Sequence, residues 1–337
     1  MGSLPTEQSV LLHAVSVLRG GHVVAFPTET VYGLGADATN AEAVHRIFAA
    51  KGRPSTNPLI VHVSDSHIAK RYAKHWPPAA EALARRFWPG PLTLVVPKGD
   101  AIVPEVTAGR ETVGIRAPDH PVALELLRAF DGPVAAPSAN RSNRVSPTTA
   151  GHVRRDLGDR VDLILDGGPC RVGIESTVLD LTGLRPVILR PGAVTREQIE
   201  AVVGPVEVFQ GHMHASDAAH SPGQQVIHYS PRTAAYRFPT GDAALVRRWM
   251  DQHADERAIV LLPGSRELSD VDDVASPRVQ TVEMPADAEG YARELYAALH
   301  EADDSGVSAI FVQMPPDAPQ WAAVRDRLMR ATRPIDG

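Results

Sequence analysis

The sequence lacks several features that define common classes of protein. It has a single cysteine, Cys170, so no disulfide can form within the chain, which fits a reducing compartment such as the cytoplasm. No unbroken apolar run approaches the roughly 18 residues of a membrane-spanning helix. The first residues, MGSLPTEQSV, lack the basic and apolar segments of a signal peptide. We therefore expect a cytoplasmic protein with no membrane association.

Positive charge is also scarce. The 337 residues carry a formal net charge of −6, whereas a protein that binds nucleic acid mainly by electrostatic attraction should be basic. Aromatic residues make up only 5% of the chain and are not interleaved with basic ones, as they are in many RNA-binding surfaces. We therefore expect no strong direct binding of nucleic acid, although a local basic cavity is compatible with this balance.

Familiar catalytic and cofactor motifs are missing too. The chain contains neither a Walker nor a Rossmann glycine fingerprint, so a nucleotide would have to bind by other means. There is no GxSxG elbow for Ser/His/Asp hydrolysis. Three histidines, His212, His214 and His220, lie in HMHASDAAH, but no second Cys/His cluster accompanies them. This stretch is more typical of a solvated linker than of a metal site.

What is present predicts a two-domain α/β protein. The length and the 43% content of hydrophobic residues allow two domains of the usual size. Residues 1–207 mix two kinds of periodicity and predict one α/β domain. There we expect helices at 6–19, 78–87, 120–130 and 195–203, another helix opened by Asn40, and strands at 22–26, 58–63, 92–97, 112–117, 133–137, 162–168, 175–181 and 187–192.

The rest of the chain divides at a polar stretch. Residues 208–232 are small and polar without period, so they predict a linker. Residues 233–337 then alternate strands with helices, which predicts a small open α/β domain with a parallel sheet. The expected strands are 233–238, 257–262, 278–283 and 307–313, and the expected helices are 242–253, 286–300 and 319–331.

The segment PTETVYGLG, residues 27–35, follows an expected strand. Its hydroxyl and carboxylate side chains come where α/β proteins often bind ligands. Gly33 and Gly35 would let the backbone approach a ligand closely or adopt a positive φ. The alternative is an ordinary strand-to-helix loop.

The segment KGRPSTNPL, residues 51–59, combines two cations with two prolines. Arg53 offers a planar fork for a carboxylate or phosphate, and Lys51 offers a compact point charge. Pro54 and Pro58 restrict the turn, so less entropy is lost when it binds a ligand. A solvated helix C-terminus would also favour cations, but it explains Arg53 less well. The segment therefore predicts an anion site.

Three further segments add to this set. Arg116 lies in the apolar strand TVGIRAP, where a cation should face an anion or, alternatively, a structural partner carboxylate. PSAN (137–140) and SPT (146–148) are rich in small hydroxyl residues, although such residues are common in turns. ESTVLDL (175–181) and ILRPG (188–192) contribute more hydroxyls and Arg190.

Taken in order, these segments resemble the YrdC-type threonylcarbamoyl-AMP synthases. The resemblance rests on PTETVYGLG, KGRP with NPL, PSAN with SPT, ESTVLDL, LRPG, and SPG with HYSP, and it runs from about residue 8 to the end. The C-terminal region resembles the extra domain of the long, two-domain form. The resemblance implies a YrdC-like twisted-sheet catalytic domain with an open basic cavity, followed by a smaller Rossmann-like α/β domain.

The resemblance also implies an activity. Members of this family are nucleotidyltransferases that join L-threonine, bicarbonate (or CO₂) and ATP into threonylcarbamoyl-AMP and pyrophosphate. Other proteins downstream then transfer the threonylcarbamoyl group to an adenosine of certain tRNAs. The anion expected at KGRPSTNPL would then be the phosphates of ATP.

The family pattern assigns residues to each substrate. The implied threonine-binding residues are Thr30, His62, Arg116, Ala136 and Ser176. The implied ATP-binding residues are Lys51, Arg53, Asn57, Thr112, Ser138, Ser146, Arg190 and Tyr229. Lys51 and Arg53 would also be catalytic, because they would stabilise charge on the phosphoryl oxygens. Mg²⁺ would accompany ATP, with no protein ligand assigned.

The linker carries one departure from the family pattern. Tyr229 would close over the nucleotide as part of a lid that excludes water. Between SPG and HY the family often carries basic or aromatic residues, but here Gln224–Ile227 reads QQVI.

Two other functions share this fold. One is an RNA-binding regulator, which the acidic net charge disfavours. The other is a carbamoyl-transfer module, as in hydrogenase-maturation and antibiotic-carbamoylating relatives. Those relatives carry additional catalytic or zinc-binding domains that this sequence does not show.

Overall fold

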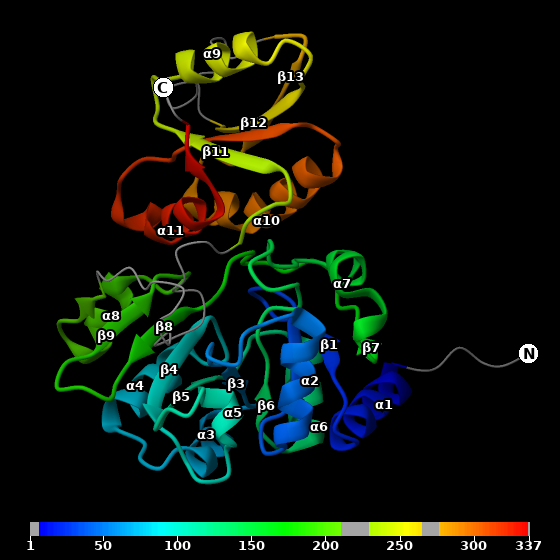
Figure 1. Cartoon of the computed structure of the whole chain (residues 1–337). Helices are drawn as coiled ribbons and strands as arrows, with labels where there is room; N and C mark the ends of the chain where they lie inside the picture. Colours follow the sequence, from blue (N-terminus) through cyan, green and yellow to red (C-terminus); the bar gives the residue numbers. More distant parts are fainter. Residues whose placement is uncertain (1–6, 210–228, 265–275, 336–337) are drawn as a thin grey trace, which may run out of the picture. The chain divides into compact units, whose positions relative to one another are not determined.

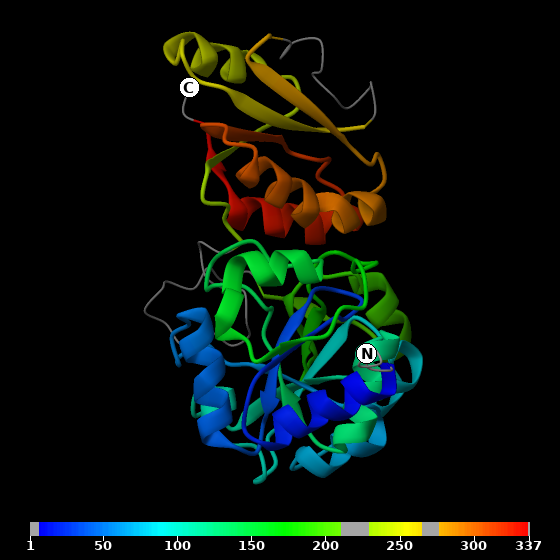
Figure 2. The same ribbon diagram turned by 90° about the vertical axis from the view of Figure 1, so that its right-hand side faces the viewer.

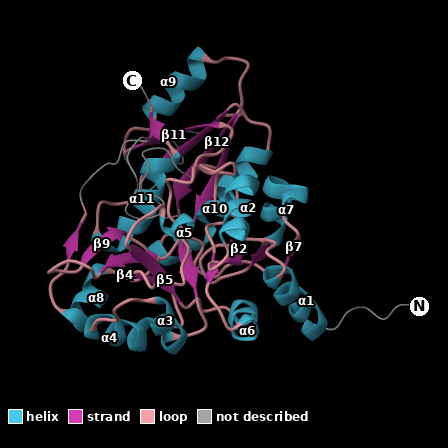
Figure 3. Cartoon of the chain, turned by 60° about the horizontal axis from the view of Figure 1, so that its bottom comes forward, coloured by secondary structure: helices cyan, strands magenta, loops and turns pink. Residues whose placement is uncertain are grey.

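The computed structural model describes residues 7–209, 229–264 and 276–335, and it divides them into two compact units. The first unit comprises residues 7–142, 146–171 and 175–209. The second comprises residues 143–145, 172–174, 229–264 and 276–335. Figure 1 labels their helices and strands. Both units mix helices with sheets (Figure 3), which confirms the predicted α/β class.

The described strands of the first unit form one mixed sheet, in the order β10-β9-β8-β4-β5-β3-β6-β2-β1-β7. The strands are β1 (Val24–Phe26), β2 (Gly33–Asp37), β3 (Ile60–His62), β4 (Leu92–Pro97), β5 (Thr112–Arg116), β6 (Val134–Ala135), β7 (Leu163–Ile164), β8 (Thr177–Asp180), β9 (Val187–Arg190) and β10 (Glu207–Val208). The helices are α1 (Glu7–Arg19), α2 (Ala41–Lys51), α3 (Ser66–Tyr72), α4 (Pro78–Phe87), α5 (Pro104–Thr107), α6 (Pro121–Phe130), α7 (Ala150–Leu157), the 3-10 turn η1 (Gly158–Arg160) and α8 (Arg196–Val203).

Helices cover this sheet unequally on its two faces. On one face, α1 and α6 pack over β1 and β6, where Leu18 and Leu126 share a core with Phe26. On the other face, α2, α4 and α8 share a larger core with the central strands, including Ile47 and Leu94. Helices α1 and α6 cover one face of the sheet at its β1 and β6 end. Further along, over β3, β5, β4 and β8, the same face carries polar side chains.

Local sequence explains the helix that leads into the predicted anion site. The Asn40 side chain caps α2 by accepting hydrogen bonds from the backbone N–H groups of Glu42 and Ala43. The helix ends at Gly52, which adopts a left-handed φ of 60° and sends its N–H back to the last turn. The predicted helix opened by Asn40, with Lys51 in its last turn, is therefore confirmed.

The alternative that Gly33 and Gly35 adopt a positive φ was wrong. Both lie within β2, which pairs antiparallel with β1, and neither has a positive φ. A Cβ on Gly35 would lie 2.7 Å from Cε1 of Phe26 and 2.8 Å from Cγ1 of Val134. Glycine is needed at position 35 because the core leaves no room for a side chain.

Several short elements were not predicted. Helices α3 and α7 begin at Asp65 and Thr149, whose side chains accept hydrogen bonds from the N–H groups of Ile68 and His152. These are ordinary N-cap residues, but the sequence analysis assigned no element to either segment. Strands β2, β10 and β15 and helix α5 were also unexpected, and β1 and β7 are shorter than their predicted ranges.

The second unit has the parallel sheet that alternation predicted. Its order is β13-β12-β14-β11-β15, and every pairing is parallel. The elements are β11 (Ala234–Phe238), α9 (Ala244–Gln252), β12 (Ala258–Pro263), β13 (Val279–Met284), α10 (Ala288–Asp304), β14 (Ala309–Gln313), the 3-10 turn η2 (Pro319–Trp321), α11 (Ala322–Ala331) and β15 (Arg333–Pro334). Within this unit, α10 and α11 lie side by side on one face of the sheet and α9 lies on the other (Figures 1 and 2).

Most of the predicted linker lies outside the described residues. Of residues 208–232, only 208–209 and 229–232 are described, so His212, His214, His220 and Gln224–Ile227 fall outside. The boundaries 1–207, 208–232 and 233–337 stay a prediction. Among the residues that are described, no helix is both long and apolar enough to cross a membrane.

Candidate functional site

The register of the first sheet places predicted site residues on one face. His62 of β3 pairs with Arg116 of β5, and Val178 of β8 pairs with Arg190 of β9. Side chains of directly paired residues point to the same side of a sheet. His62 and Arg116 therefore share a face, as do Val178 and Arg190.

Strand β4 joins these two pairs. Val95 of β4 lies opposite Gly114 of β5, and Thr93 of β4 lies opposite Val178 of β8. Residues two apart in a strand share a face, so Thr93 and Val95 point the same way, as do Gly114 and Arg116. The predicted residues on β3, β5 and β9 thus project from one face, across the five neighbouring strands β3, β5, β4, β8 and β9.

Arg116 is held by several groups in this face. Its Nη1 donates to Oγ1 of Thr30 at 2.9 Å, and its Nε donates to the carbonyl of Gly90 at 3.2 Å. Its Nη2 lies 2.6 Å from Oε2 of Glu29. Arg116 and Glu29 are 3% and 0% exposed, so the structural ion pair left open by the sequence is present. A ligand carboxylate would share the guanidinium with Glu29.

Glu29 supplies the carboxylate of PTETVYGLG, which the sequence marked as a polar candidate without assigning it a role. Besides Arg116, its Oε2 accepts a hydrogen bond from the backbone N–H of Asp119 at 3.0 Å. The neighbouring Thr30 hydroxyl lies 2.8 Å from that of Thr28, which also accepts from the backbone of Val31. The polar groups after β1 therefore form a fixed network around Arg116.

A second cluster forms around Arg190. Its Nε and Nη2 donate to the carbonyl oxygen of Ser176 at 3.1 and 3.0 Å, and Nη2 also lies 3.2 Å from the Ser176 hydroxyl. That hydroxyl is 2.8 Å from the hydroxyl of Thr93, another residue that was not predicted. The structure thus brings together Ser176, assigned to threonine, and Arg190, assigned to ATP.

Lys51 is directed at the PSAN loop. Its Nζ donates to the carbonyl oxygens of Ser138 and Asn140 and lies 3.4 Å from Oδ1 of Asn140. An ammonium has three N–H donors, so all of them have acceptors in this loop. Burial, together with the positive charge of Arg53, lowers the pKa of Lys51 well below its ordinary value. Lys51 therefore fixes the position of Ser138.

Arg53 lies in the turn that follows. It is 7% exposed, its Nη2 donates to the carbonyl of Pro58 at 3.1 Å, and its Nε lies 3.4 Å from the carbonyl of Asn57. The guanidinium is thus anchored inside the proline-containing turn, as the sequence predicted. Asn57 is itself buried.

The remaining predicted residues of the first unit lie around these clusters. Ser146 donates to Oε1 of Glu175 at 2.6 Å, and both are buried. The backbone N–H of Ala136 donates to the carbonyl of Ile60. Burial first, and then the charge of Arg116, lowers the pKa of His62 to about 3, so its imidazole is neutral.

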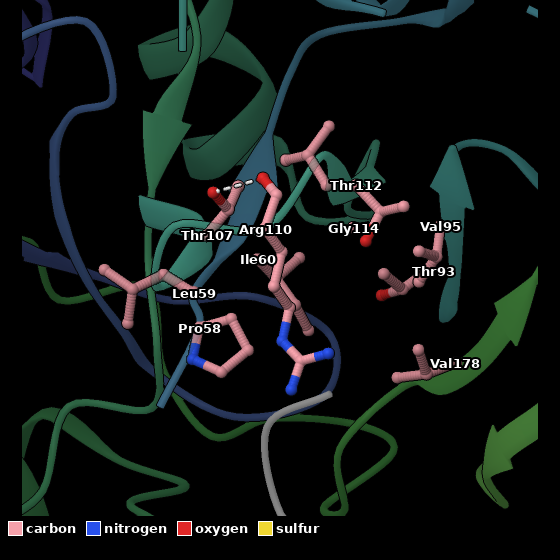
Figure 4. Close-up of a pocket in the computed structure, with 11 residues that line it drawn as sticks. Pro58, Leu59, Ile60, Thr93, Val95, Thr107, Arg110, Thr112, Gly114 and Val178 are labelled. Atoms are coloured by element: carbon pink, nitrogen blue, oxygen red, sulfur yellow. Dashed lines mark hydrogen bonds between the residues drawn. The ribbon is translucent and has the colours of Figure 1, made fainter. Parts of the chain in front are cut away.

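A small hollow lies on the same face of the sheet (Figure 4). It is lined by Thr112, the predicted ATP residue of β5, and by Arg110, a half-buried residue that was not predicted. Apolar side chains from β3, β4 and β8 complete it. The hollow therefore adjoins the two arginine clusters.

Tyr229 is not part of this first-unit cluster. It belongs to the second unit, where its ring is 1% exposed and lies 5.7 Å from the ring of Tyr296. The guanidinium carbon of Arg327 lies 5.5 Å from the same ring. Closure of Tyr229 over a nucleotide stays a prediction.

The described residues contain no group of three His, Cys, Asp or Glu side chains that could hold a metal ion. Burial raises the pKa of the Cys170 thiol to about 12, which leaves it protonated and unreactive. The site instead gathers buried cations, hydroxyls and a neutral histidine on the face of a twisted sheet. This arrangement is typical of an α/β protein that binds a small polar ligand on the face of its sheet.

Comparisons with known proteins indicate which family of α/β proteins the chain resembles. A family model described as telomere recombination, for the Sua5, YciO and YrdC group, matches residues 16–192. A second, described as threonylcarbamoyl-AMP synthase, C-terminal domain, matches residues 194–332.

Individual relatives match along nearly the whole chain. A threonylcarbamoyl-AMP synthase of Bacillus subtilis is 44% identical over 97% of this chain and 94% of its own length. One from Pyrococcus abyssi is 42% identical over 95% and 93%. The crystal structure of P. abyssi Sua5 complexed with L-threonine has a TM-score of 0.87 at 38% identity, covering 98% of this chain and 97% of that one. The chain belongs to the threonylcarbamoyl-AMP synthase family, in its two-domain form.

Proposed function

We propose that the protein is an L-threonylcarbamoyladenylate synthase. It joins L-threonine, bicarbonate or CO₂, and ATP into threonylcarbamoyl-AMP and releases pyrophosphate. One observation carries the proposal. The register places His62, Arg116 and Arg190 on one sheet face, with Ser176 bonded to Arg190, in a chain that matches such synthases along its length.

Threonine would bind at the Arg116 end of this face. The Arg116 guanidinium would take the substrate carboxylate, since planar bidentate pairing suits that group. Thr30 already bonds to Arg116 and would lie beside the carboxylate. Neutral His62 can donate or accept a hydrogen bond without adding charge. Ala136 and Ser176 complete the proposed threonine set.

ATP would bind toward the Arg190 end and the surrounding loops. The proposed ATP set is Lys51, Arg53, Asn57, Thr112, Ser138, Ser146, Arg190 and Tyr229. Arg53 and Arg190 would meet the phosphates directly, because each guanidinium can form charge-assisted hydrogen bonds. Lys51 would act mainly through the PSAN loop that it holds, which places Ser138.

The chemistry needs positioning and charge stabilisation more than a protein nucleophile. The threonine amine adds to CO₂ with loss of a proton from its nitrogen, or to bicarbonate with loss of water, and gives a carbamate. A carbamate oxygen then attacks the α-phosphorus of ATP, and pyrophosphate leaves in line. Negative charge gathers on the phosphoryl oxygens, where Arg53 and the field of Lys51 would stabilise it. Holding three small reactants in one site supplies much of the rate.

Other components of the reaction remain proposals. Mg²⁺ would enter with ATP and neutralise phosphate charge, and we assign it no protein ligand because the described residues offer no cluster for one. Tyr229 and the linker would exclude water from the unstable product. The product would pass to tRNA threonylcarbamoyl-transfer proteins in the cytoplasm, where ATP and tRNA are available.

Pyrophosphate release from ATP tests the proposal, with threonine and bicarbonate each omitted in turn. We expect release only when both are present, and little with serine. Release with carbamoyl phosphate in their place would instead identify a carbamoyl-transfer module. No release from a folded protein would contradict both activities, and salt-sensitive RNA binding would then be measured.

A further inference from the structure

We propose that the second unit carries an anion site of its own, in which the guanidinium of Arg237 binds the phosphate group of a small phosphorylated molecule. The site is a cavity of about 530 Å³ at the start of β11, a volume within the range of ligand pockets. Its lining residues all belong to the second unit, and none of them is proposed to bind threonine or ATP.

The lining of this cavity is basic. Of the 13 described residues that line it, four are arginines and none is acidic, although the whole chain has a net charge of −6. Such a lining attracts anions into the cavity. The four arginines are Arg232, Arg237, Arg330 and Arg333.

Two of these arginines lack a counter-charge. Arg232 and Arg330 form ion pairs with aspartates of α10 and α11. Arg237 and Arg333 form no ion pair with any carboxylate of the described residues. A phosphate monoester carries about −1.5 to −2 charge at neutral pH, so it matches two uncompensated cations better than a single carboxylate does.

Arg237 is held at one end of its guanidinium only. Its Nη1 donates to the carbonyl oxygens of Met329 and Thr332, at the end of α11. Its Nε and Nη2 have no acceptor among the described residues. These two groups form the edge of a guanidinium that can bind two oxygens of one phosphate.

A purely structural role explains only half of this geometry. Arginines near the end of a helix often donate to its last carbonyls, as Nη1 of Arg237 does. That contact does not require the edge formed by Nε and Nη2. Burial lowers the pKa of the half-buried Arg237, and no carboxylate beside it offsets this effect. A bound phosphate would supply the counter-charge.

Arg333 contributes charge to the cavity and no direct contact. It pairs with Tyr236, the neighbour of Arg237 in β11, so its side chain points to the opposite face of the sheet. There its Nη2 donates to the Tyr236 hydroxyl at 2.7 Å. Arg237 is therefore the cation that we assign to the phosphate.

The cavity also has an apolar side, which suits the organic part of a phosphorylated molecule. Met329 lines it and is 47% exposed, although methionine is usually buried. Ala234, Ala235 and Pro334 add further apolar surface. Ligand pockets commonly combine such a wall with a few polar groups that fix the orientation of the ligand.

The first test measures how inorganic phosphate protects individual arginines of the full chain from phenylglyoxal, a reagent that modifies accessible guanidinium groups. Mass spectrometry of the peptides reports Arg237 separately from the arginines of the proposed synthase site. We expect phosphate to slow the modification of Arg237 several-fold, and acetate at the same ionic strength to have little effect. Arg248 is the matched control, because it is exposed on α9, on the other face of the sheet.

Two variants at the rim of the cavity leave Arg237 in place. Met329→Glu adds a negative charge there, and Met329→Gln adds a side chain of the same shape without charge. We expect Met329→Glu to raise the phosphate concentration that protects Arg237 by about 3- to 10-fold, through charge repulsion, and Met329→Gln to leave it unchanged. Because Met329 is exposed, both variants should fold, which thermal unfolding checks.

Four outcomes would overturn the proposal. If Arg237 resists phenylglyoxal without phosphate, its second edge is not open. If phosphate protects Arg237 and Arg248 equally, the effect is one of ionic strength. Equal protection by acetate would mean that the cavity does not select phosphate. Equal phosphate dependence in the Glu and Gln variants would mean that the phosphate binds outside this cavity.

Discussion

The carboxylate of Glu29 lies 2.6 Å from the guanidinium of Arg116, and both side chains are almost completely buried. Removing one partner of a buried ion pair leaves an uncompensated charge. A threonine carboxylate that binds Arg116 therefore joins an existing pair. Its charge would add to that of Glu29 around one guanidinium, which links substrate binding to the stability of the site.

Glu29→Gln tests this link. We expect the free energy of unfolding to fall by about 3–5 kcal/mol without substrate, because Arg116 loses its counter-charge. Saturating L-threonine restores a carboxylate, so it should raise the unfolding temperature more in the variant than in the wild type. Thermal unfolding with and without threonine measures both effects. Glu197→Gln, at an exposed position of α8, is the control. An equal threonine shift in Glu29→Gln and wild type would contradict the prediction.

Much of the fold could be predicted because it depends on local patterns. Helix α4 and strand β4 have the predicted bounds, since Pro78 marks a helix start and LTLVVP is a continuous buried strand. Strand β2 could not be predicted in the same way. Phe26 and Val134 crowd Gly35, so this position of the strand has room only for glycine. Those contacts join residues that are distant in sequence.

The candidate site could also be predicted only in part. The sequence indicated which segments carry cations and hydroxyls, but not which atoms those groups meet. Arg116 and Glu29 are far apart in the chain, and only the sheet register brings them together. The ammonium of Lys51 donates to backbone carbonyls of the PSAN loop. Every residue has a backbone carbonyl, so the sequence does not indicate which ones act as acceptors.

Arg53→Ala should remove most of the proposed activity while the protein stays folded. The guanidinium is fixed in the turn by the carbonyls of Pro58 and Asn57, so it is preorganised for a developing charge. Losing one such donor costs about 10²–10³-fold in kcat. Pyrophosphate release at saturating substrates measures this loss. Arg46→Ala, at an exposed position of α2, is the matched control. Near-wild-type turnover in Arg53→Ala would remove Arg53 from the catalytic set.

Lys51→Met should behave differently from Arg53→Ala. Methionine keeps the length of the side chain but leaves the carbonyls of Ser138 and Asn140 without their donor, which costs about 1–3 kcal/mol of unfolding free energy. Because the loop then loses its position, we expect the KM for ATP to rise together with the loss of stability. A fall in kcat with unchanged stability would instead mean that Lys51 contacts the phosphates directly.

His62 should make stability depend on pH. Burial and Arg116 lower its pKa from 6.5 to about 3 in the folded protein. Between these values the unfolded chain binds a proton that the folded chain does not. Stability is therefore complete above about pH 6.5 and falls as the pH drops toward 3, by up to about 1.4 kcal/mol per pH unit from this group.

A non-titrating variant isolates that contribution. His62→Asn keeps a polar side chain but cannot bind the proton, so its unfolding free energy should fall less steeply than that of the wild type below pH 6.5. Urea unfolding at several values between pH 4.5 and 7.5 measures the two slopes. His45→Gln, at an exposed position of α2, should keep the wild-type slope. If His62→Asn also kept that slope, the imidazole would already carry a proton in the folded protein, and a neutral His62 could no longer be part of the proposed threonine site.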